Sequence, residues 1–454
     1  METTQKLSIK EKIGYGLGDT ASNFYFQMFI NFLLFFYTDV FGIPAAAAGT
    51  MFLVTRIWDT VNDPLMGVIA DRTNTKWGKF RPYLVWGSLP IAVIGVFTFS
   101  TPELSVTGKI IYAYITYTLM MMAYTFINIP YSALMGVLSP NSLERTSLSS
   151  YRFILAFVGG FIIQGLTLPM VEYFGGGDQA FGFQMAMVVY SVLGVVLFLV
   201  TFATTKERVS PPKEQKTSLK NDIKDLLNNR PWVVLFFMGV FSLSYIVIRS
   251  GTILYYFKYF VGKESLATLF LVLGTVGVII GVAATEPLTK IFGKRKLYLI
   301  VMIITTILTV FFYFIPKEQI FLIFAMHILI SMIMAPQAPL VWAMYADTAD
   351  YSEWKNGRRA TGLVFSAATF AQKLGIAIGG GFSGWLLAIF GFVANVEQTP
   401  EALNGIQLMM SVIPAIAGIG AVIAVLFYKL DDEKMKQIEN DLTARKSETG
   451  IVEA

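Results

Sequence analysis

Long apolar stretches alternate with short polar connections along almost the whole chain. A helix that crosses a bilayer needs about 20 mainly apolar residues, and by that criterion the pattern predicts an all-α membrane protein with twelve transmembrane helices. The approximate limits of these spans are 24–41, 45–70, 83–100, 110–138, 152–171, 181–204, 232–256, 266–288, 298–315, 319–345, 361–390 and 406–428.

The longest polar interruption separates the first six spans from the last six. We therefore expect four parts: an N-terminal six-helix bundle (1–204), a central cytoplasmic loop (205–231), a C-terminal six-helix bundle (232–428) and a cytoplasmic tail (429–454). Apolar residues at helical spacing within the loop predict an amphipathic helix on the membrane surface. A weak repeat relates the halves, since Gly78–Leu84 after the second span resembles Gly293–Leu299 after the eighth. Two pseudo-symmetric bundles are typical of transporters.

The polar connections differ in charge. Of the 35 lysines and arginines, 27 fall on one side of the predicted spans, and only Lys109, Lys258, Lys263 and Lys317 fall on the other. Cytoplasmic loops are enriched in basic residues, so we expect both termini in the cytoplasm of a multi-pass protein of the cell (inner or plasma) membrane. The first apolar stretch is too long and too far from Met1 for a typical signal peptide.

Composition excludes several classes of protein. The chain is 55% hydrophobic and 14% charged, whereas a soluble domain averages about 25% charged residues. The net charge of +5 resides mainly between apolar stretches, which does not indicate nucleic-acid binding. With no cysteine and a single histidine, His327, the chain offers no thiol chemistry, histidine-rich metal site or Ser/His relay. It also contains no nucleotide-binding motif, so we expect neither an enzyme nor an ATP-driven pump, and no cofactor.

Charged residues inside the predicted spans are the strongest functional signal, because each is costly to insert in a bilayer. Asp59 and Asp63 share one face of the second span. A bound Na⁺ or H⁺ would relieve their repulsion, and Asn62 and Thr125 offer further oxygens that suit Na⁺. Lys373 in the eleventh span is the natural counter-charge. The alternative is a permanent salt-bridge network that holds helices together, although one lysine does not neutralise two acids.

Two arginines within spans could bind a substrate, because a guanidinium presents a rigid fork of donors. Arg152 opens the fifth span and Arg249 lies in the middle of the seventh. Each could contact sugar hydroxyls or a carboxylate. The alternatives are packing at a helix interface for Arg152, and pairing with an Asp or with backbone carbonyls for Arg249. His327 is most simply a hydrogen-bonding residue in helix packing.

Several motifs resemble the glycoside–pentoside–hexuronide:cation symporter (melibiose permease-like) family of the major facilitator superfamily. The resemblance extends over nearly the whole chain, and the motifs that carry it are Tyr37–Val40, Arg56–Pro64, Asn128–Tyr131, Phe181–Met185, Ala346–Tyr351 and Lys373. It implies the major facilitator fold of two six-helix bundles and cation-coupled sugar transport.

The resemblance also implies residue roles. The cation site would comprise Asp59, Asn62, Asp63 and Thr125, with Na⁺ held at the two carboxylates. The sugar site would comprise Asn23, Tyr124, Asn128, Arg152, Thr369 and Lys373, and to these we add Arg249 because of its position within a span. A cytoplasmic gate would comprise Asp347, Asp350, Glu353 and Arg359, and to this charge network we add the basic residues Arg145 and Arg295.

Two departures from the family pattern bear on the substrate. Where the melibiose permease has carboxylates on helices 1 and 4, this chain has Asn23 and Asn128, and Ser132 replaces a tryptophan. The family's galactoside contacts are therefore altered, and we do not expect a simple galactoside. An amide keeps hydrogen bonds without negative charge, which would accept a hexuronate paired with Arg249, or a neutral xyloside or other glycoside.

The sequence thus predicts a symporter that imports a sugar or glycoside with Na⁺ or H⁺ by alternating access. The alternatives are a uniporter or exchanger without cation coupling, and a membrane sugar sensor that does not translocate its ligand. We expect the partners to be the sugar, the coupling cation and the lipid bilayer, with no nucleic acid, and the protein to act as a monomer.

Overall fold

The computed structural model describes residues 6–139, 142–208, 226–356 and 361–448. Their backbone is almost entirely helical, and the only β-pairing among them is an isolated bridge between Thr75 and Gly78. Most of the helix predicted in the central loop lies outside these residues. The chain divides into two compact units, one formed by Met1–Lys213, Lys263–Val272 and Gly384–Ala402, and the other by Glu214–Gly262, Leu273–Ser383 and Leu403–Ala454.

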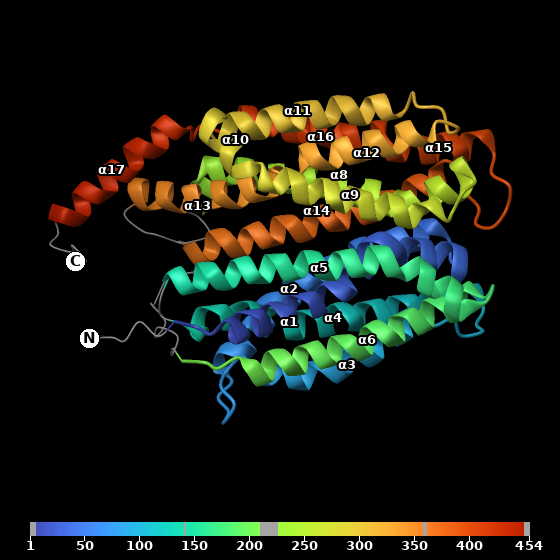
Figure 1. Ribbon diagram of the computed structural model, residues 1–454, viewed down its shortest axis with the longest axis horizontal. Coiled ribbons are helices and arrows are strands. Elements are labelled where there is room, and N and C mark those ends of the chain that lie inside the picture. Colours follow the sequence, from blue (N-terminus) through green and yellow to red (C-terminus); the bar gives the residue numbers. More distant parts are fainter. Residues whose placement is uncertain (1–5, 140–141, 209–225, 357–360, 449–454) are drawn as a thin grey trace. The chain divides into compact units, whose positions relative to one another are not determined.

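The first unit contains the helices of the N-terminal half. These are α1 (Ile9–Met28), the π-helical segments η1 (Phe29–Leu33) and η2 (Phe36–Val40), α2 (Ala45–Arg72), α3 (Pro82–Thr98), α4 (Val106–Leu138), α5 (Ser142–Gly175) and α6 (Gln179–Thr204). Helices α1, α5 and α6 pack against one another, α3 packs against α4 and α6, and α2 packs against α4 (Figure 1).

The first helix begins well before the predicted limit of residue 24. Ser8 caps α1 by accepting a hydrogen bond from the Glu11 amide, and the helix continues through the π-helical segments to Val40. An oxygen-bearing cap of this kind stabilises the first turn. The hydropathy pattern missed residues 9–23 because that stretch is polar along one face.

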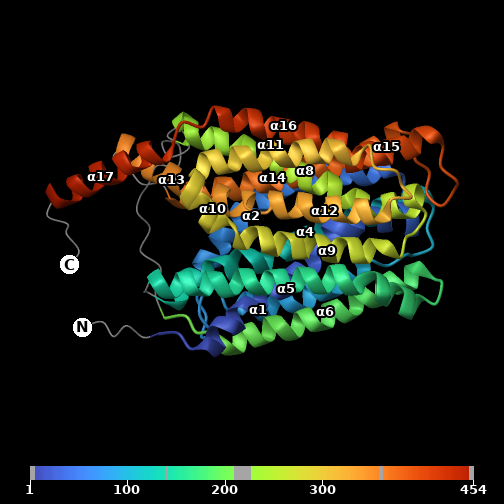
Figure 2. The ribbon, with the colours of Figure 1, turned by 45° about the horizontal axis from the view of Figure 1, so that its top comes forward.

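The second unit contains the helices of the C-terminal half. These are α8 (Arg230–Tyr255), η3 (Tyr256–Val261), α9 (Leu266–Ala283), α10 (Thr285–Phe292), α11 (Lys294–Phe312), α12 (Ile320–Met334), α13 (Gln337–Asn356), α14 (Thr361–Ile389), α15 (Pro400–Met410), α16 (Val412–Leu426) and α17 (Asp432–Glu448). The first turns of α9 and the last residues of α14 belong to the first unit. Helix α16 packs along α8 and α11, and α17 packs against α13 (Figure 2).

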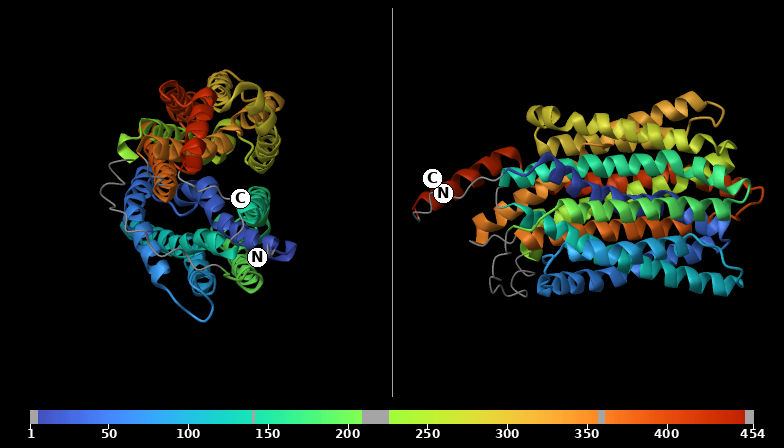
Figure 3. Two further views of the ribbon diagram at one scale, coloured as in Figure 1. Left: turned by 90° about the vertical axis from the view of Figure 1, so that its left-hand side faces the viewer. Right: turned by 60° about the horizontal axis from the view of Figure 1, so that its bottom comes forward.

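Taken as continuous runs, these helices match the twelve predicted spans. Figure 3 (left) shows most of them nearly end-on within each unit. Among the described residues, eight runs are long and apolar enough to cross a membrane, and Pro82–Thr98 is a shorter apolar helix. The three remaining runs carry Asn23, the Asp59/Asp63 pair and Lys373, respectively. Polar residues inside a membrane bundle lower the mean hydropathy of the helices that carry them.

Candidate substrate and cation site

A ladder of polar side chains runs along α1 and into η1. Asp19, Asn23, Gln27 and Asn31 follow at intervals of four residues, so they share one face of the helix. The Asn23 amide donates to the Asp19 carbonyl oxygen over 3.0 Å, and the Asn31 amide donates to Gln27 Oε1 over 2.9 Å. At Gly159 of α5, an added Cβ would lie 2.9 Å from the Thr20 carbonyl oxygen, so glycine permits α5 to lie close to this part of α1.

Arg152 of α5 forms an ion pair with the first member of this ladder. Its Nε donates to Asp19 Oδ2 over 3.1 Å, and the two side chains are 25% and 11% exposed. The guanidinium also lies over the ring of Tyr131, 5.3 Å from its centre. The Asp19 bond uses Nε alone, and Tyr15 lies close enough to hydrogen-bond to the guanidinium as well, so only part of its N–H donors remain for a ligand.

Helix α4 adds Tyr124 and Asn128, which share one face. The Asn128 amide donates to the Tyr124 carbonyl oxygen over 3.1 Å, which leaves its own Oδ1 as an acceptor. The Tyr124 ring stacks on that of Phe26, with centres 6.5 Å apart. Tyr124 also lies close enough to Asp19 and Arg152 to interact electrostatically with both charges. These residues are therefore neighbours within the N-terminal unit.

The predicted cation residues join α2 to α4. The buried Thr125 hydroxyl donates to Asp63 Oδ1 over 2.9 Å. Asn62 and Asp63 are half-buried, whereas the side chain of Asp59, one helical turn before Asp63, lies outside the described part of the structure. Carboxylate, amide and hydroxyl oxygens are hard donors of the kind that an alkali cation takes.

The other predicted sugar-site residues lie in α14 and α8. Thr369 is exposed and Lys373, one turn later, is half-buried. Arg249 is buried: its Nε donates to the Met410 carbonyl oxygen over 3.3 Å, and one terminal nitrogen lies 3.1 Å from His327 Nδ1. The other terminal nitrogen of Arg249 has no hydrogen-bond partner within the described residues. Contact with a backbone carbonyl is the alternative that the sequence left open for Arg249, and His327 has the packing contact expected of it.

The predicted gate residues are only partly described. Asp347 is mostly buried and both its oxygens lie 2.6 Å from Lys294 Nζ, so its partner is Lys294. The neighbouring Arg295 donates to the Leu426 carbonyl oxygen over 3.2 Å. Asp350 and Glu353 follow Asp347 along α13. The side chain of Arg145, and Arg359 altogether, lie outside the described residues.

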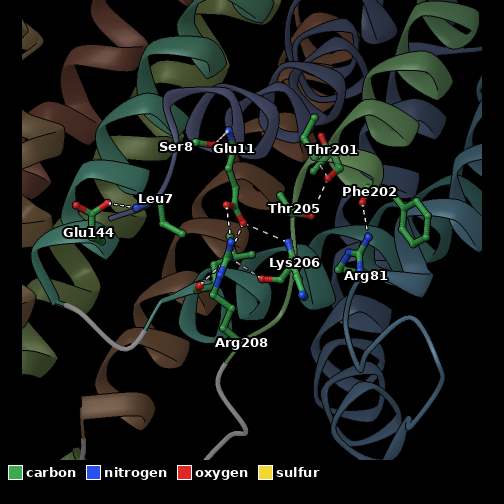
Figure 4. Close-up of polar contacts among 12 residues, drawn as sticks. Leu7, Ser8, Glu11, Arg81, Glu144, Thr201, Phe202, Thr205, Lys206 and Arg208 are labelled. Atoms are coloured by element: carbon green, nitrogen blue, oxygen red, sulfur yellow. Dashed lines mark hydrogen bonds and ion pairs between the residues drawn. The ribbon is translucent and has the colours of Figure 1, made fainter. Parts of the chain in front are cut away.

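The segment after α6 is fastened to the rest of the N-terminal unit by charged residues (Figure 4). Arg208 forms a bidentate ion pair with Glu11, with bonds of 2.6 and 2.9 Å, and also donates to the Leu138 carbonyl oxygen. The hydrogen bond to Glu11 raises the pKa of Arg208 above its ordinary value. Glu207 accepts hydrogen bonds from three successive backbone amides at residues 79–81, at the start of α3.

A second ion pair joins the start of α1 to the start of α5. Glu144 lies 2.8 Å from Lys12 Nζ and accepts a hydrogen bond from the Leu7 amide. The hydrogen bond from Lys12 lowers the pKa of Glu144. We refer to this pair and the Arg208–Glu11 pair as the terminal clasps.

Sequence reasoning missed Asp19, Gln27, Gln164 and the terminal clasps. The four-residue spacing of polar residues from Asp19 to Asn31 was a usable signal, since it identifies a helix face that begins before residue 24. Gln164 donates to Gln27 over 3.4 Å, a contact between residues 137 apart in sequence. No local sequence pattern predicts contacts between residues so far apart along the chain.

Charged, amide and aromatic side chains gathered inside a bundle of apolar helices are typical of a membrane transporter. The chain matches the family model described as "MFS/sugar transport protein" over residues 14–432, and it belongs to that family. The predicted major facilitator fold and the assignment as a transporter and not an enzyme are confirmed. The predicted function, sugar:cation symport, is confirmed by this family match and by the names of the relatives that follow.

Named relatives match almost the whole chain. The chain is 40% identical to the putative glycoside/cation symporter YagG of Escherichia coli, over 98% of this chain and 97% of the relative. It is 37% identical to the isoprimeverose transporter of Lactiplantibacillus pentosus (94% and 90%) and 32% identical to the glucuronide carrier protein homolog of Escherichia coli (97% and 97%). The fold is similar to that of a bacterial homologue of the lysosomal transporter Spinster, with a TM-score of 0.65 at 13% identity over 95% of this chain and 97% of that one.

Proposed function

We propose that this protein imports a sugar or glycoside together with Na⁺ or H⁺. The observation that carries the proposal is the 2.9 Å hydrogen bond from Thr125 to Asp63. It joins the predicted cation residues of α2 to the helix that carries Tyr124 and Asn128. A cation at Asp63 can take the Thr125 hydroxyl oxygen as a further ligand, so cation binding acts on α4 and on the affinity for sugar. By linkage, the sugar raises the affinity for the cation by the same factor.

Na⁺ and H⁺ differ in what they need from this site. A proton needs only a carboxylate, whereas Na⁺ needs several oxygen ligands. Asn62 and Thr125 supply such oxygens beside Asp63, which favours Na⁺. Transport then proceeds by alternating access of a central site, as in other transporters built from two halves.

We propose a neutral glycoside or pentoside as the first candidate substrate. Asp19 and Arg152 form an ion pair within the N-terminal unit, and the asparagines at 23 and 128 are uncharged. The positive and negative charges of this part of the site therefore balance. Two amides, a tyrosine ring and the remaining guanidinium donors suit the hydroxyls and apolar face of a sugar ring. The isoprimeverose transporter, at 37% identity, carries a name that fits this candidate.

A hexuronide is the second candidate. It is favoured by the buried terminal nitrogen of Arg249 that lacks a hydrogen-bond partner within the described residues, because a carboxylate is the acceptor that guanidinium binds best. The glucuronide carrier protein homolog, at 32% identity, is a relative whose name matches this candidate.

Uptake into proteoliposomes distinguishes the candidates. Purified protein is given a labelled xyloside, glucuronide or galactoside under an imposed Na⁺ or H⁺ gradient. We expect concentrative uptake of the xyloside, driven by one of the cations, and little uptake of the galactoside. Uptake of glucuronide that is lost in Arg249→Gln would favour the second candidate. Uptake that equilibrates without responding to either gradient would identify a uniporter, and binding without uptake a sensor.

We further propose that the protein acts as a monomer in the inner membrane with both termini in the cytoplasm. The chain contains no cysteine, so single cysteines introduced near each end can be labelled with impermeant maleimide without background. Labelling only after the membrane is opened supports this orientation, and labelling of intact cells contradicts it.

A further inference from the structure

The C-terminal unit has a cavity of about 1050 Å³ where α8 begins and α16 ends. Four basic side chains line it: Arg230, Lys355, Lys429 and Lys434. Arg230 is the first residue of α8, and Lys429 follows the end of α16 by three residues. Both helices belong to candidate membrane spans. The basic end of the cavity therefore lies at the level where a span meets the polar region of the membrane.

An apolar groove of about 320 Å³ continues from this cavity along α8 and α16. Its lining consists of Val233, Val234, Phe237, Phe241, Gly420, Ile423, Ala424 and Phe427, and three of these residues also line the basic cavity: Val233, Val234 and Phe427. A Cβ at Gly420 would lie 2.9 Å from the Phe241 ring. The floor of the groove thus depends on the absence of a side chain at this position.

The basic residues that line the cavity differ in their contacts. Asp431 accepts a hydrogen bond from the Lys434 amide and so caps α17, and Lys434 itself lies over the Trp354 ring at 4.7 Å. Arg230 and Lys429 are exposed, and within the described residues neither has an ion-pair partner. With Asp431 and Glu433 counted against the four basic residues, the lining remains net positive.

We propose that this cavity and groove bind one acidic glycerophospholipid. The phosphate lies between Arg230 and Lys429, and one acyl chain lies in the groove between α8 and α16. An amphiphile matches a cavity that is cationic at one end and purely apolar at the other, and basic clusters beside spans attract anionic lipids. The amino-terminal end of α8 adds the partial positive charge of the helix dipole. A water-soluble phosphate compound has no apolar part that would fill the groove.

Binding there joins three elements of the C-terminal unit. The lipid contacts the start of α8, the end of α16 and, through Lys434 and Gln437, the first turns of α17. A ligand that binds only the folded state stabilises it. We therefore expect added phosphatidylglycerol to raise the thermal stability of the purified protein more than phosphatidylcholine does.

Native mass spectrometry of the full-length protein in detergent tests the basic end. Phosphatidylglycerol and phosphatidylcholine are titrated onto wild type, onto the Arg230→Gln/Lys429→Gln variant and onto the control Lys296→Gln/Lys436→Gln. The control removes two exposed basic residues from α11 and α17 that do not line the cavity. We expect the first variant to bind phosphatidylglycerol about tenfold more weakly, which is about 1.4 kcal/mol, and the control to bind as wild type does. Equal loss in both variants, or equal binding of the two lipids by wild type, overturns the proposal.

A second pair of variants tests the apolar end. Ile423→Trp fills the groove, whereas Ile419→Trp places the same bulk one turn earlier on α16, outside the lining and at similar exposure (48% against 52%). We expect only Ile423→Trp to lose lipid. If glycerol phosphate, which has no acyl chains, displaces the lipid at the lipid's own concentration, the groove is not used and the proposal is wrong.

Discussion

Replacement of Arg152 by glutamine separates a binding role from a structural one. The substitution leaves the Asp19 carboxylate, which is 11% exposed, without its ion-pair partner. Breaking a fully buried pair costs about 3–5 kcal/mol, and because Arg152 is 25% exposed we expect a loss of about 2 kcal/mol in the free energy of unfolding. The variant also lacks the charged donors for the sugar. A hydrogen bond to a charged group contributes about 1.5–3 kcal/mol, so sugar affinity should fall about 10- to 100-fold.

The double variant Asp19→Asn/Arg152→Gln provides the decisive comparison. It removes both charges and leaves two amides that can bond to each other, so we expect most of the lost stability to return. Sugar affinity should not return, because the charged donors are still missing. Thermal unfolding in detergent measures the first quantity, and calorimetric titration with the transported sugar measures the second. If sugar affinity recovers along with stability, Arg152 only holds α1 to α5 and the reasoning is refuted.

Three further predictions follow from the N-terminal unit. Thr125→Val keeps the shape of the side chain but removes the hydroxyl, and we expect the cation concentration for half-maximal transport to rise about tenfold; an unchanged value would exclude Thr125 from the cation site. Arg208→Gln should speed proteolytic cleavage in the central loop, because its clasp to α1 is lost, whereas the matched control Lys206→Gln, whose side chain is not part of the clasp, should be cleaved at the wild-type rate. The pKa of Glu144 is lowered by Lys12, so the folded state binds fewer protons than the unfolded state and the pair stabilises above the ordinary carboxyl pKa. The stability difference between wild type and Glu144→Gln should therefore be present at pH 7 and vanish as the pH falls below about 4; a difference that persists at low pH would contradict this account.

The sequence predicted the apolar architecture well and the polar interior less completely. Most of the spans could be predicted because a membrane-crossing helix is mainly apolar over about 20 residues. Asp63 and Thr125 were assigned to one cation site from oxygen-bearing residues in two spans and a family resemblance, and the structure places them in hydrogen-bond contact. Asp19 was missed because hydropathy placed the start of the first helix at residue 24, whereas the helix begins at Ile9, after the Ser8 cap.

Contacts between distant residues mark the limit of such prediction. Arg208 and Glu11 are 197 residues apart, and nothing local to either one specifies the other. The same holds for Asp347, which pairs with Lys294 and not with Arg295, the residue that follows Lys294 in the sequence. Which of two adjacent basic residues faces an acid depends on helix rotation, and rotation is set by packing around the whole unit.

The most direct test of coupled transport is sugar-induced cation movement in right-side-out membrane vesicles. External pH and Na⁺ are recorded together while xylosides, glucosides and uronides are added, in wild type and in Asp63→Asn. This variant removes the charge but keeps an oxygen that can accept from Thr125. We predict that one class of sugar draws in Na⁺ or H⁺ with wild type and that Asp63→Asn abolishes the cation signal. Entry of sugar without any cation signal in wild type, or an unchanged signal in Asp63→Asn, would contradict the assignment of Asp63 to a coupling site.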